Sequence, residues 1–204
     1  MRTGYFTACH RIVGRLRLDD NCAAQIVEFA VSLPLLVLFV VGIFDFSGAF
    51  TLKQKLTNIA RDAARTAAAG PASDLSSSQP VSVVDAFHVI DEYFKANNLL
   101  DCGITLSSSP NKLKWRSTAS GNGCPSPGLT IIINRAYYFP ITGATLPPSD
   151  CDAQAPGSQP ALVGTCVSIK YAYDWRFGRV ASLLGQSAAL PPSIPAIGVA
   201  LNEN

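Results

Sequence analysis

The chain has 204 residues, of which 15% are charged, and a formal net charge of +2. A balance this close to neutral, without a long run of lysine or arginine, excludes nucleic acid as an implied partner. The positive mean hydropathy comes from one apolar run, and the rest has an ordinary soluble composition, enough for about one domain of 100–150 residues.

The first 23 residues form a short basic leader. It has arginine at positions 2, 11, 15 and 17, against aspartate at positions 19 and 20. Lysine and arginine also follow the apolar run, so the charge difference across it is small. Positive charge beside a first membrane helix keeps that side in the cytoplasm. We therefore expect residues 1–23 to be cytoplasmic and the chain beyond the helix to be periplasmic.

Residues 26–44 form an apolar run in which only Glu28 and Ser32 are polar. A hydrocarbon core needs about 20 apolar helical residues, whereas a soluble core helix shows a polar face at roughly every fourth residue. No such face exists between Leu33 and Phe44. The run is therefore predicted to be a transmembrane helix. Pro34 within it removes one backbone hydrogen bond and is predicted to kink the helix.

A cleaved secretory signal is the alternative for this run. Ser47-Gly48-Ala49 has the small-x-small form of a cleavage box, but the apolar region of a signal is usually about 7–15 residues long, and this one is longer. A lipoprotein signal does not fit, because the apolar stretch follows Cys22 instead of preceding it. We therefore favour an anchor that stays in the membrane.

The helix is expected to continue out of the membrane as far as residue 69. Apolar residues recur there at spacings of three and four, with charged residues on the other faces, which indicates an amphipathic helix. Gly70-Pro71 then forms a stop signal. Residues 24–69 are thus predicted to be one long helix, half apolar and half amphipathic. Its expected buried positions are Leu52, Leu56, Ile59, Ala60, Ala63 and Ala67.

Residues 70–204 are predicted to form an α+β domain with a short antiparallel sheet. A second helix is expected at 81–99 after a loop at 71–80, and strands are expected at 100–107, 129–139 and 165–177 with loops between them. The apolar tail, 178–204, is broken by Pro191-Pro192 and is too interrupted for a second span. It either lies along the membrane surface or packs on the sheet.

The chain has six cysteines, and four of them follow the apolar run. Four cysteines in a loop-rich domain beyond a membrane anchor indicate two disulfides and an oxidising compartment. Three pairings are open, and we favour Cys102–Cys124 with Cys151–Cys166 because sequential pairs close the shorter loops. Zinc is disfavoured, since no C-x-x-C spacing and no histidine accompany these cysteines.

The sequence shows no pattern of a catalytic or cofactor site. His10 and His88 are its histidines, and His88 has Asp85 and Asp91 nearby on the predicted second helix. Such common residues can always be arranged as a triad on paper, but the motifs of serine hydrolases, zinc proteases and phosphate-binding loops are missing. We therefore expect no catalytic residues, no metal, no cofactor and no enzymatic activity.

Glu28 is the informative polar residue, because a carboxylate a few residues into a membrane segment is costly. Insertion scales give about 2.5–3.5 kcal/mol at the helix centre and less near the edge. Glu28 either reaches the headgroup layer or has a cationic partner in the membrane. A free α-amine is one such cation, and cleavage of the leader just upstream would create it within a turn or so of Glu28.

A basic leader, small residues, Glu28-Phe29 and a long apolar helix look like a class III type IV prepilin signal. More narrowly, residues 23–36 (AAQIVEFAVSLPLL) and 42–46 (GIFDF) resemble the TadE-like family, the accessory (minor) pseudopilins of the tight adherence, or Tad/Flp, pilus. Residues 56–65 (LTNIARDAAR) are similar to that family's segment N-A-A-R-E-G-A-R, with Asp62 in place of Glu and Ala63 in place of Gly.

The resemblance implies how the helix is processed and what it docks against. The family's glutamate is the fifth residue after prepilin-peptidase cleavage, which places the cut between Ala23 and Ala24; the family generally has Gly where this chain has Ala23. Glu28, Phe29 and Pro34 are then the expected helix-docking residues. The implied partners are other pilins and pseudopilins, the inner-membrane platform of the pilus and the prepilin peptidase.

Two further function classes stay open at this point. One is a single-pass, membrane-anchored periplasmic binding or adhesion module, for which Glu28 would have no use. The other is a membrane-anchored hydrolase, whose activity would be lost in a His88→Ala variant. The resemblance favours a non-enzymatic pseudopilin of the bacterial inner membrane, and whether it also enters the pilus is open.

Overall fold

The computed structural model describes residues 20–107, 113–140, 151, 161–178 and 190–203. The chain forms two compact units, residues 1–44 and residues 45–204. The first long element, α2 (Asp20–Ala69), belongs to both units and is described here in two parts. The architecture is α+β, as predicted: a long apolar helix, then a small domain with an antiparallel sheet and two disulfides.

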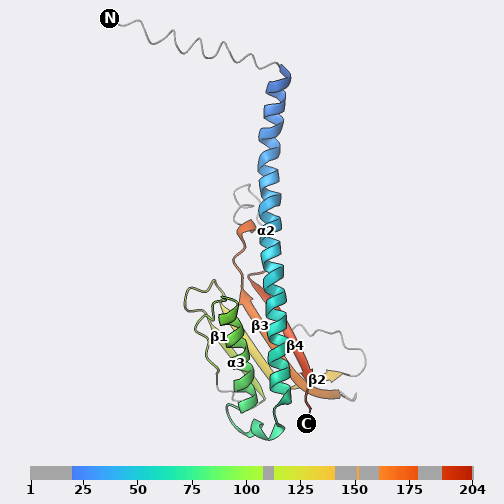
Figure 1. The fold of residues 1–204 in the computed structure, drawn as a ribbon, viewed down its shortest axis with the longest axis vertical. Helices are drawn as coiled ribbons and strands as arrows, with labels where there is room; N and C mark the ends of the chain where they lie inside the picture. The colour runs from blue at the N-terminus through green and yellow to red at the C-terminus, as the bar shows by residue number, and fades with distance from the viewer. Residues whose placement is uncertain (1–19, 108–112, 141–150, 152–160, 179–189, 204) are drawn as a thin grey trace, which may run out of the picture. The chain divides into compact units, whose positions relative to one another are not determined.

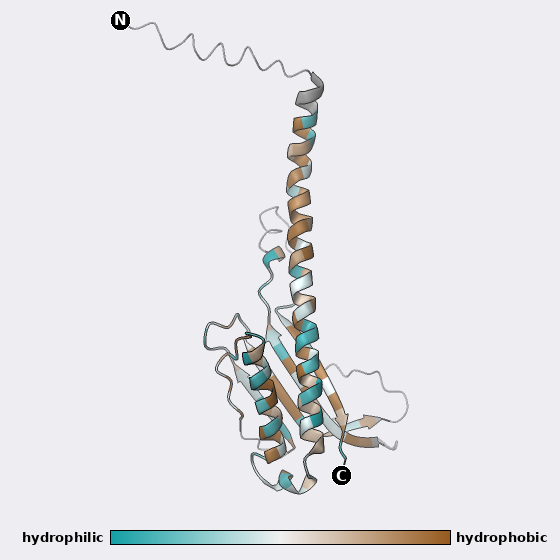
Figure 2. Cartoon of the chain, in the orientation of Figure 1, coloured by the Kyte–Doolittle hydropathy of each residue, from teal (hydrophilic) through white to brown (hydrophobic). Residues whose placement is uncertain are grey.

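In the first unit, α2 carries an apolar surface that the structure leaves uncovered. Within the part of the chain that is described, it is the one helix long and apolar enough to cross a membrane. Large apolar side chains are exposed around it, from Ile26 (57%) to Phe44 (74%), and hydrophobic residues predominate along this part of the helix in Figure 2. The helix continues through Pro34. A soluble core helix would instead bury such residues.

In the second unit, α2 is amphipathic and packs on the domain. The predicted apolar stripe is confirmed, since each of its members is buried: Leu52, Leu56, Ile59, Ala60, Ala63 and Ala67. The helix ends at Ala69, where the Gly70 N–H donates to the Ala67 carbonyl. A short 3-10 helix, η1 (Ala72–Ser76), follows in the predicted loop, and α3 (Val81–Ala96) is the predicted second helix, ending three residues early.

The sheet has four antiparallel strands in the order β1-β2-β3-β4. The two helices, α3 and this part of α2, cover one of its faces (Figure 1). Apolar residues of alternating positions meet the helices there, for example Ile131 opposite Ile169 in the β2–β3 register. The strands are β1 (Lys114–Ala119), β2 (Leu129–Pro140), β3 (Ala161–Ala172) and β4 (Ser193–Leu201).

Close contact between α2 and β4 depends on a missing side chain. A Cβ built on Gly198 would lie 2.2 Å from the backbone carbon and oxygen of Ala60, and 2.4 Å from the Arg61 nitrogen. Lys53, about two turns before Ala60, donates from its ammonium to the Pro195 carbonyl of the same strand. The sequence left two alternatives for the tail, the membrane surface or packing on the sheet. Residues 193–201 of the tail are part of the sheet, as strand β4.

Three strand predictions need correction. Residues 100–107 form no strand but an irregular segment with a turn at 102–103, because Cys102 and Gly103 have φ of 58° and 70° and the Ile104 N–H donates to the Asp101 carbonyl. β1 lies inside a segment predicted to be a loop, where Trp115 and Ser117 are buried and their neighbours are not. The predicted strand 165–177 begins earlier, at Ala161, and ends at Ala172.

The two disulfides are Cys102–Cys124 and Cys151–Cys166, the sequential pairs that the sequence favoured. The first closes the turn after α3 onto the loop before β2. The second belongs to a smaller cluster with Ile132 and Tyr137, on the sheet face opposite the helices. A register shift in β2 between Asn134 and Tyr137 brings Tyr137 to this face, because it interrupts the two-residue alternation of the strand.

Candidate functional site on the long helix

The expected processing and docking residues lie at the start of α2. The bond between Ala23 and Ala24 falls in the first turns of the helix, which begins at Asp20. Glu28 and Phe29 are exposed, Phe29 to 64%. Both side chains are therefore accessible on the helix surface.

Glu28 shares one face of the helix with Gln25 and Ser32, since residues three, four and seven apart are neighbours on an α-helix. The Ser32 hydroxyl donates to the Phe29 carbonyl at 3.2 Å, which satisfies it within the helix. The Glu28 carboxylate makes no hydrogen bond or ion pair to any residue that the structure describes. It is the one acidic group in residues 26–44, and a charged carboxylate that enters lipid needs a partner that neutralises it.

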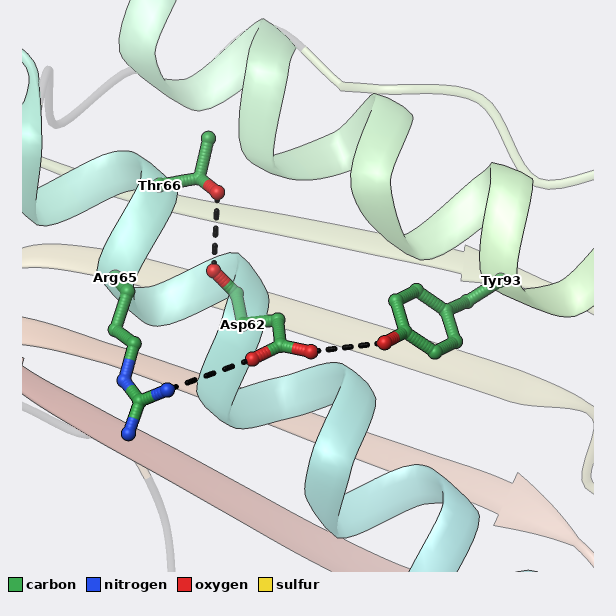
Figure 3. A network of polar contacts seen from close by, with 4 residues as sticks. All are labelled: Asp62, Arg65, Thr66 and Tyr93. Atoms are coloured by element: carbon green, nitrogen blue, oxygen red, sulfur yellow. Dashed lines mark hydrogen bonds and ion pairs between the residues drawn. The ribbon is translucent and has the colours of Figure 1, made fainter.

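A second polar group lies in the segment that resembles the family's N-A-A-R-E-G-A-R. Asp62 accepts a hydrogen bond of 2.9 Å from the Tyr93 hydroxyl of α3, and Arg65 approaches its other oxygen at 3.7 Å (Figure 3). The Thr66 hydroxyl donates to the Asp62 backbone carbonyl at 3.0 Å. The bond to Asp62 and the charge of Asp62 raise the pKa of Tyr93. The acid of this segment therefore links α2 to α3.

The alanines of the same segment have a packing role. Ala60, Ala63 and Ala64 are completely buried, and Ala60 lies against Gly198 of β4. Arg61 and Arg65 are exposed on the opposite side. Small residues on one face let the sheet approach the helix backbone, and arginines on the other keep that face solvated. The pattern is thus explained largely by the fold of the domain.

Sequence reasoning missed a buried carboxylate directly after the apolar run. Asp45 is 6% exposed. Its carboxylate accepts hydrogen bonds from the Phe177 N–H at 2.8 Å and the Tyr173 hydroxyl at 3.3 Å. The Tyr173 hydroxyl also lies 3.1 Å from the Asp45 carbonyl, and Gly48 leaves room for it, since a Cβ there would be 2.9 Å away. Burial, followed by the charge of Asp45, raises the pKa of Tyr173.

Aromatic rings gather around this carboxylate. Phe46 lies 5.3 Å from Trp175 and 6.2 Å from Phe177 between ring centroids, and Trp175 lies 4.8 Å from Tyr173. We call Asp45, Phe46, Tyr173, Trp175 and Phe177 the junction cluster. The alternation of aromatic residues at 173, 175 and 177 was visible in the sequence but was assigned to a strand. In the structure these residues follow the strand and bind α2.

A buried polar group at the other end of this part of α2 was also missed. The Arg135 side chain of β2 is 1% exposed and donates from Nη2 to the Gly70 carbonyl at 2.9 Å. Burial lowers the pKa of Arg135, and the charge of Asp74 opposes that shift. Asp74 itself accepts from the Ser82 N–H at 2.9 Å. These contacts hold the end of α2 to β2 and to the start of α3.

His88, the histidine considered for a triad, lies on α3. Its side chain is exposed on α3, as is that of Asp85. Among the described residues, no group of three or more histidine, cysteine, aspartate or glutamate side chains could hold a metal ion.

Comparison with known proteins supports one part of the chain. Residues 23–65 match the family model described as TadE-like protein. No curated protein and no solved structure matches the chain. The matched residues hold Glu28, Asp45, Phe46, Asp62 and Arg65, and so include the apolar run and the polar groups described above. The resemblance to the TadE-like family is therefore confirmed for residues 23–65, the segment that forms most of the long helix.

Proposed function

We propose that the protein is a minor pseudopilin that takes part in assembly of a Tad/Flp type IV pilus and has no enzymatic activity. The match of residues 23–65 to the TadE-like family supports an association with the Tad pilus. The apolar part of α2 is compatible with a single-pass membrane anchor. In this proposal the anchor lies in the bacterial inner membrane, with the leader in the cytoplasm and the disulfide-bonded domain in the periplasm.

The observation that carries the proposal is an exposed carboxylate in an exposed apolar helix. Glu28 has no partner among the described residues, and an isolated charge in hydrocarbon is costly. A pilin N-terminal amine beside it would neutralise that charge, and Phe29 and the following apolar side chains would pack against the neighbouring helix. Pro34 leaves one carbonyl without its usual helical donor, which lets the helix bend against a neighbour.

The test is a Glu28→Leu variant in cells that assemble the pilus. We expect loss of surface pili, counted by electron microscopy, with the variant still present in the inner membrane. Glu28→Gln, which keeps the shape but not the charge, should also abolish assembly, and Glu28→Asp should retain a part of it. Leu36→Ile, which preserves an apolar exposed position, is the matched control and should assemble normally.

The same experiment separates the proposal from an anchored binding or adhesion module. A module of that kind uses α2 as an anchor alone, and removing a charge from an anchor makes insertion easier. Full piliation in the Glu28→Leu variant would contradict the docking role and leave the anchored module as the better account.

A further inference from the structure

We propose that the aromatic side of the junction cluster is a lipid-contacting surface that seats the domain on the headgroup layer of the bilayer. The surface consists of Phe46, Trp175 and Phe177. This inference depends on the membrane anchoring in the proposed function, but on neither pilus assembly nor the role of Glu28.

Phe46 lies directly beyond the apolar run. It follows the last residue of the apolar run, Phe44, by two positions in the same helix, which corresponds to a rise of about 3 Å. The polar layer on each side of a hydrocarbon core is about 5–7 Å thick. If the apolar run fills the core, Phe46 lies within the headgroup layer. Tryptophan is enriched in that layer, and Trp175 is the ring neighbour of Phe46 at 5.3 Å.

The rings are held at the surface instead of being absorbed into the core. Phe46 is 51% exposed, and neither it nor Phe177 belongs to the hydrophobic core, where Trp175 is a partly buried neighbour. Trp175 donates its indole N–H to the Pro191 carbonyl at 2.7 Å, so its polar atom is satisfied within the protein. The rest of the ring is then free to contact acyl chains near the headgroups.

Asp45 provides the rigidity that this surface needs. Its bonds to Tyr173 and to the Phe177 N–H attach the segment after β3 to α2, with the aromatic rings on either side of the attachment. Between two of these rings, the exposed Arg176 offers a cation, which suits the phosphates of anionic lipids. A protein partner could contact aromatic residues at any level of α2, whereas the headgroup layer of a bilayer lies at the level where the apolar run ends. We therefore assign the surface to lipid.

Tryptophan fluorescence tests the inference, because the chain has two tryptophans and they differ in environment. Trp115 is 1% exposed in the core, and Trp175 lies in the junction cluster. The full chain is reconstituted in vesicles of phosphatidylcholine and phosphatidylglycerol that carry bromine either near the headgroup or near the chain end. The difference between wild type and Trp175→Phe gives the signal of Trp175, and it does not depend on replacing the core tryptophan.

We expect bromine near the headgroup to quench Trp175 at least twofold more than bromine near the chain end, and neither to quench Trp115. Asp45→Ala, which releases the segment, should reduce the shallow quenching of Trp175 by about half. Phe50→Leu, at an exposed position of α2 outside the cluster, should leave it unchanged. Absence of lipid quenching of Trp175, whether aqueous iodide reaches the ring or a neighbouring protein shields it, would overturn the inference.

Extraction of the same vesicles at alkaline pH tests membrane anchoring separately from the lipid contact of Trp175. Protein that is retained by the membrane but shows no lipid quenching of Trp175 contradicts this inference alone. Protein that is released from the membrane contradicts the anchoring on which the proposed function also rests.

Discussion

Replacing Gly198 by alanine is expected to destabilise the domain by about 3 kcal/mol or more, at the upper end of what overpacking costs. The added Cβ would lie 2.2 Å from the Ala60 carbonyl group. Those atoms belong to helix backbone and cannot move aside as a flexible side chain would. Either β4 separates from α2 or the helix shifts along its buried alanine face. For a domain of this size, the midpoint of thermal unfolding should fall by about 6–12 °C.

Gly178→Ala is the matched control for this substitution. Among the described residues, its added Cβ meets only Leu190 Cδ1, at 3.9 Å, which is an ordinary contact. Thermal unfolding of the detergent-solubilised chain, followed through the fluorescence of buried Trp115, should therefore resemble that of wild type for Gly178→Ala. A Gly198→Ala protein that unfolds at the wild-type temperature would contradict the packing of the tail against α2.

Phe94→Ala should destabilise the domain by about 3–5 kcal/mol, the usual cost of truncating a buried aromatic residue. Phe94 is 1% exposed and contacts Tyr171 edge to face, with 5.8 Å between ring centroids. Truncation removes this contact and leaves a cavity between α3 and β3, where α3 and the sheet share one core. The free energy of unfolding, measured in urea at a fixed detergent concentration, reports the loss.

Phe50→Ala makes the same chemical change on α2, at a side chain that is 64% exposed. Exposed substitutions of this kind usually change stability by no more than about 0.5 kcal/mol. Equal losses in the two variants would mean that α3 does not pack on the sheet as described.

Much of the long helix could be predicted from the sequence, because its pattern is local. The apolar run needs only its length and the lack of a polar face, and the buried stripe from Leu52 to Ala67 follows from helical spacing. Gly70-Pro71 marks the end of the helix within one residue. The disulfide pairing was favoured for a similar local reason, since each pair closes a short loop.

The missed features depend on contacts between distant parts of the chain. β4 contains Pro195 and follows Pro191-Pro192, so its sequence does not indicate a strand. The strand forms because β4 lies at the edge of the sheet and pairs with β3 alone, a position at which proline is tolerated. The burial of Asp45 could not be predicted, because its partners, Tyr173 and Phe177, are 128 and 132 residues away. Arg135 sits in an apolar strand, and only the folded chain shows the Gly70 carbonyl that it binds.

The N-terminus of the membrane-extracted protein tests the proposed function most directly. Mass spectrometry of the protein, expressed with and without a prepilin peptidase, should show a start at Ala24 that depends on the peptidase. That start places the new α-amine four residues from Glu28 and makes the charge pairing possible. A start at Phe50 would indicate a secreted protein, and an intact Met1 in both samples an unprocessed anchor. Either result would contradict the account of this chain as a processed pseudopilin.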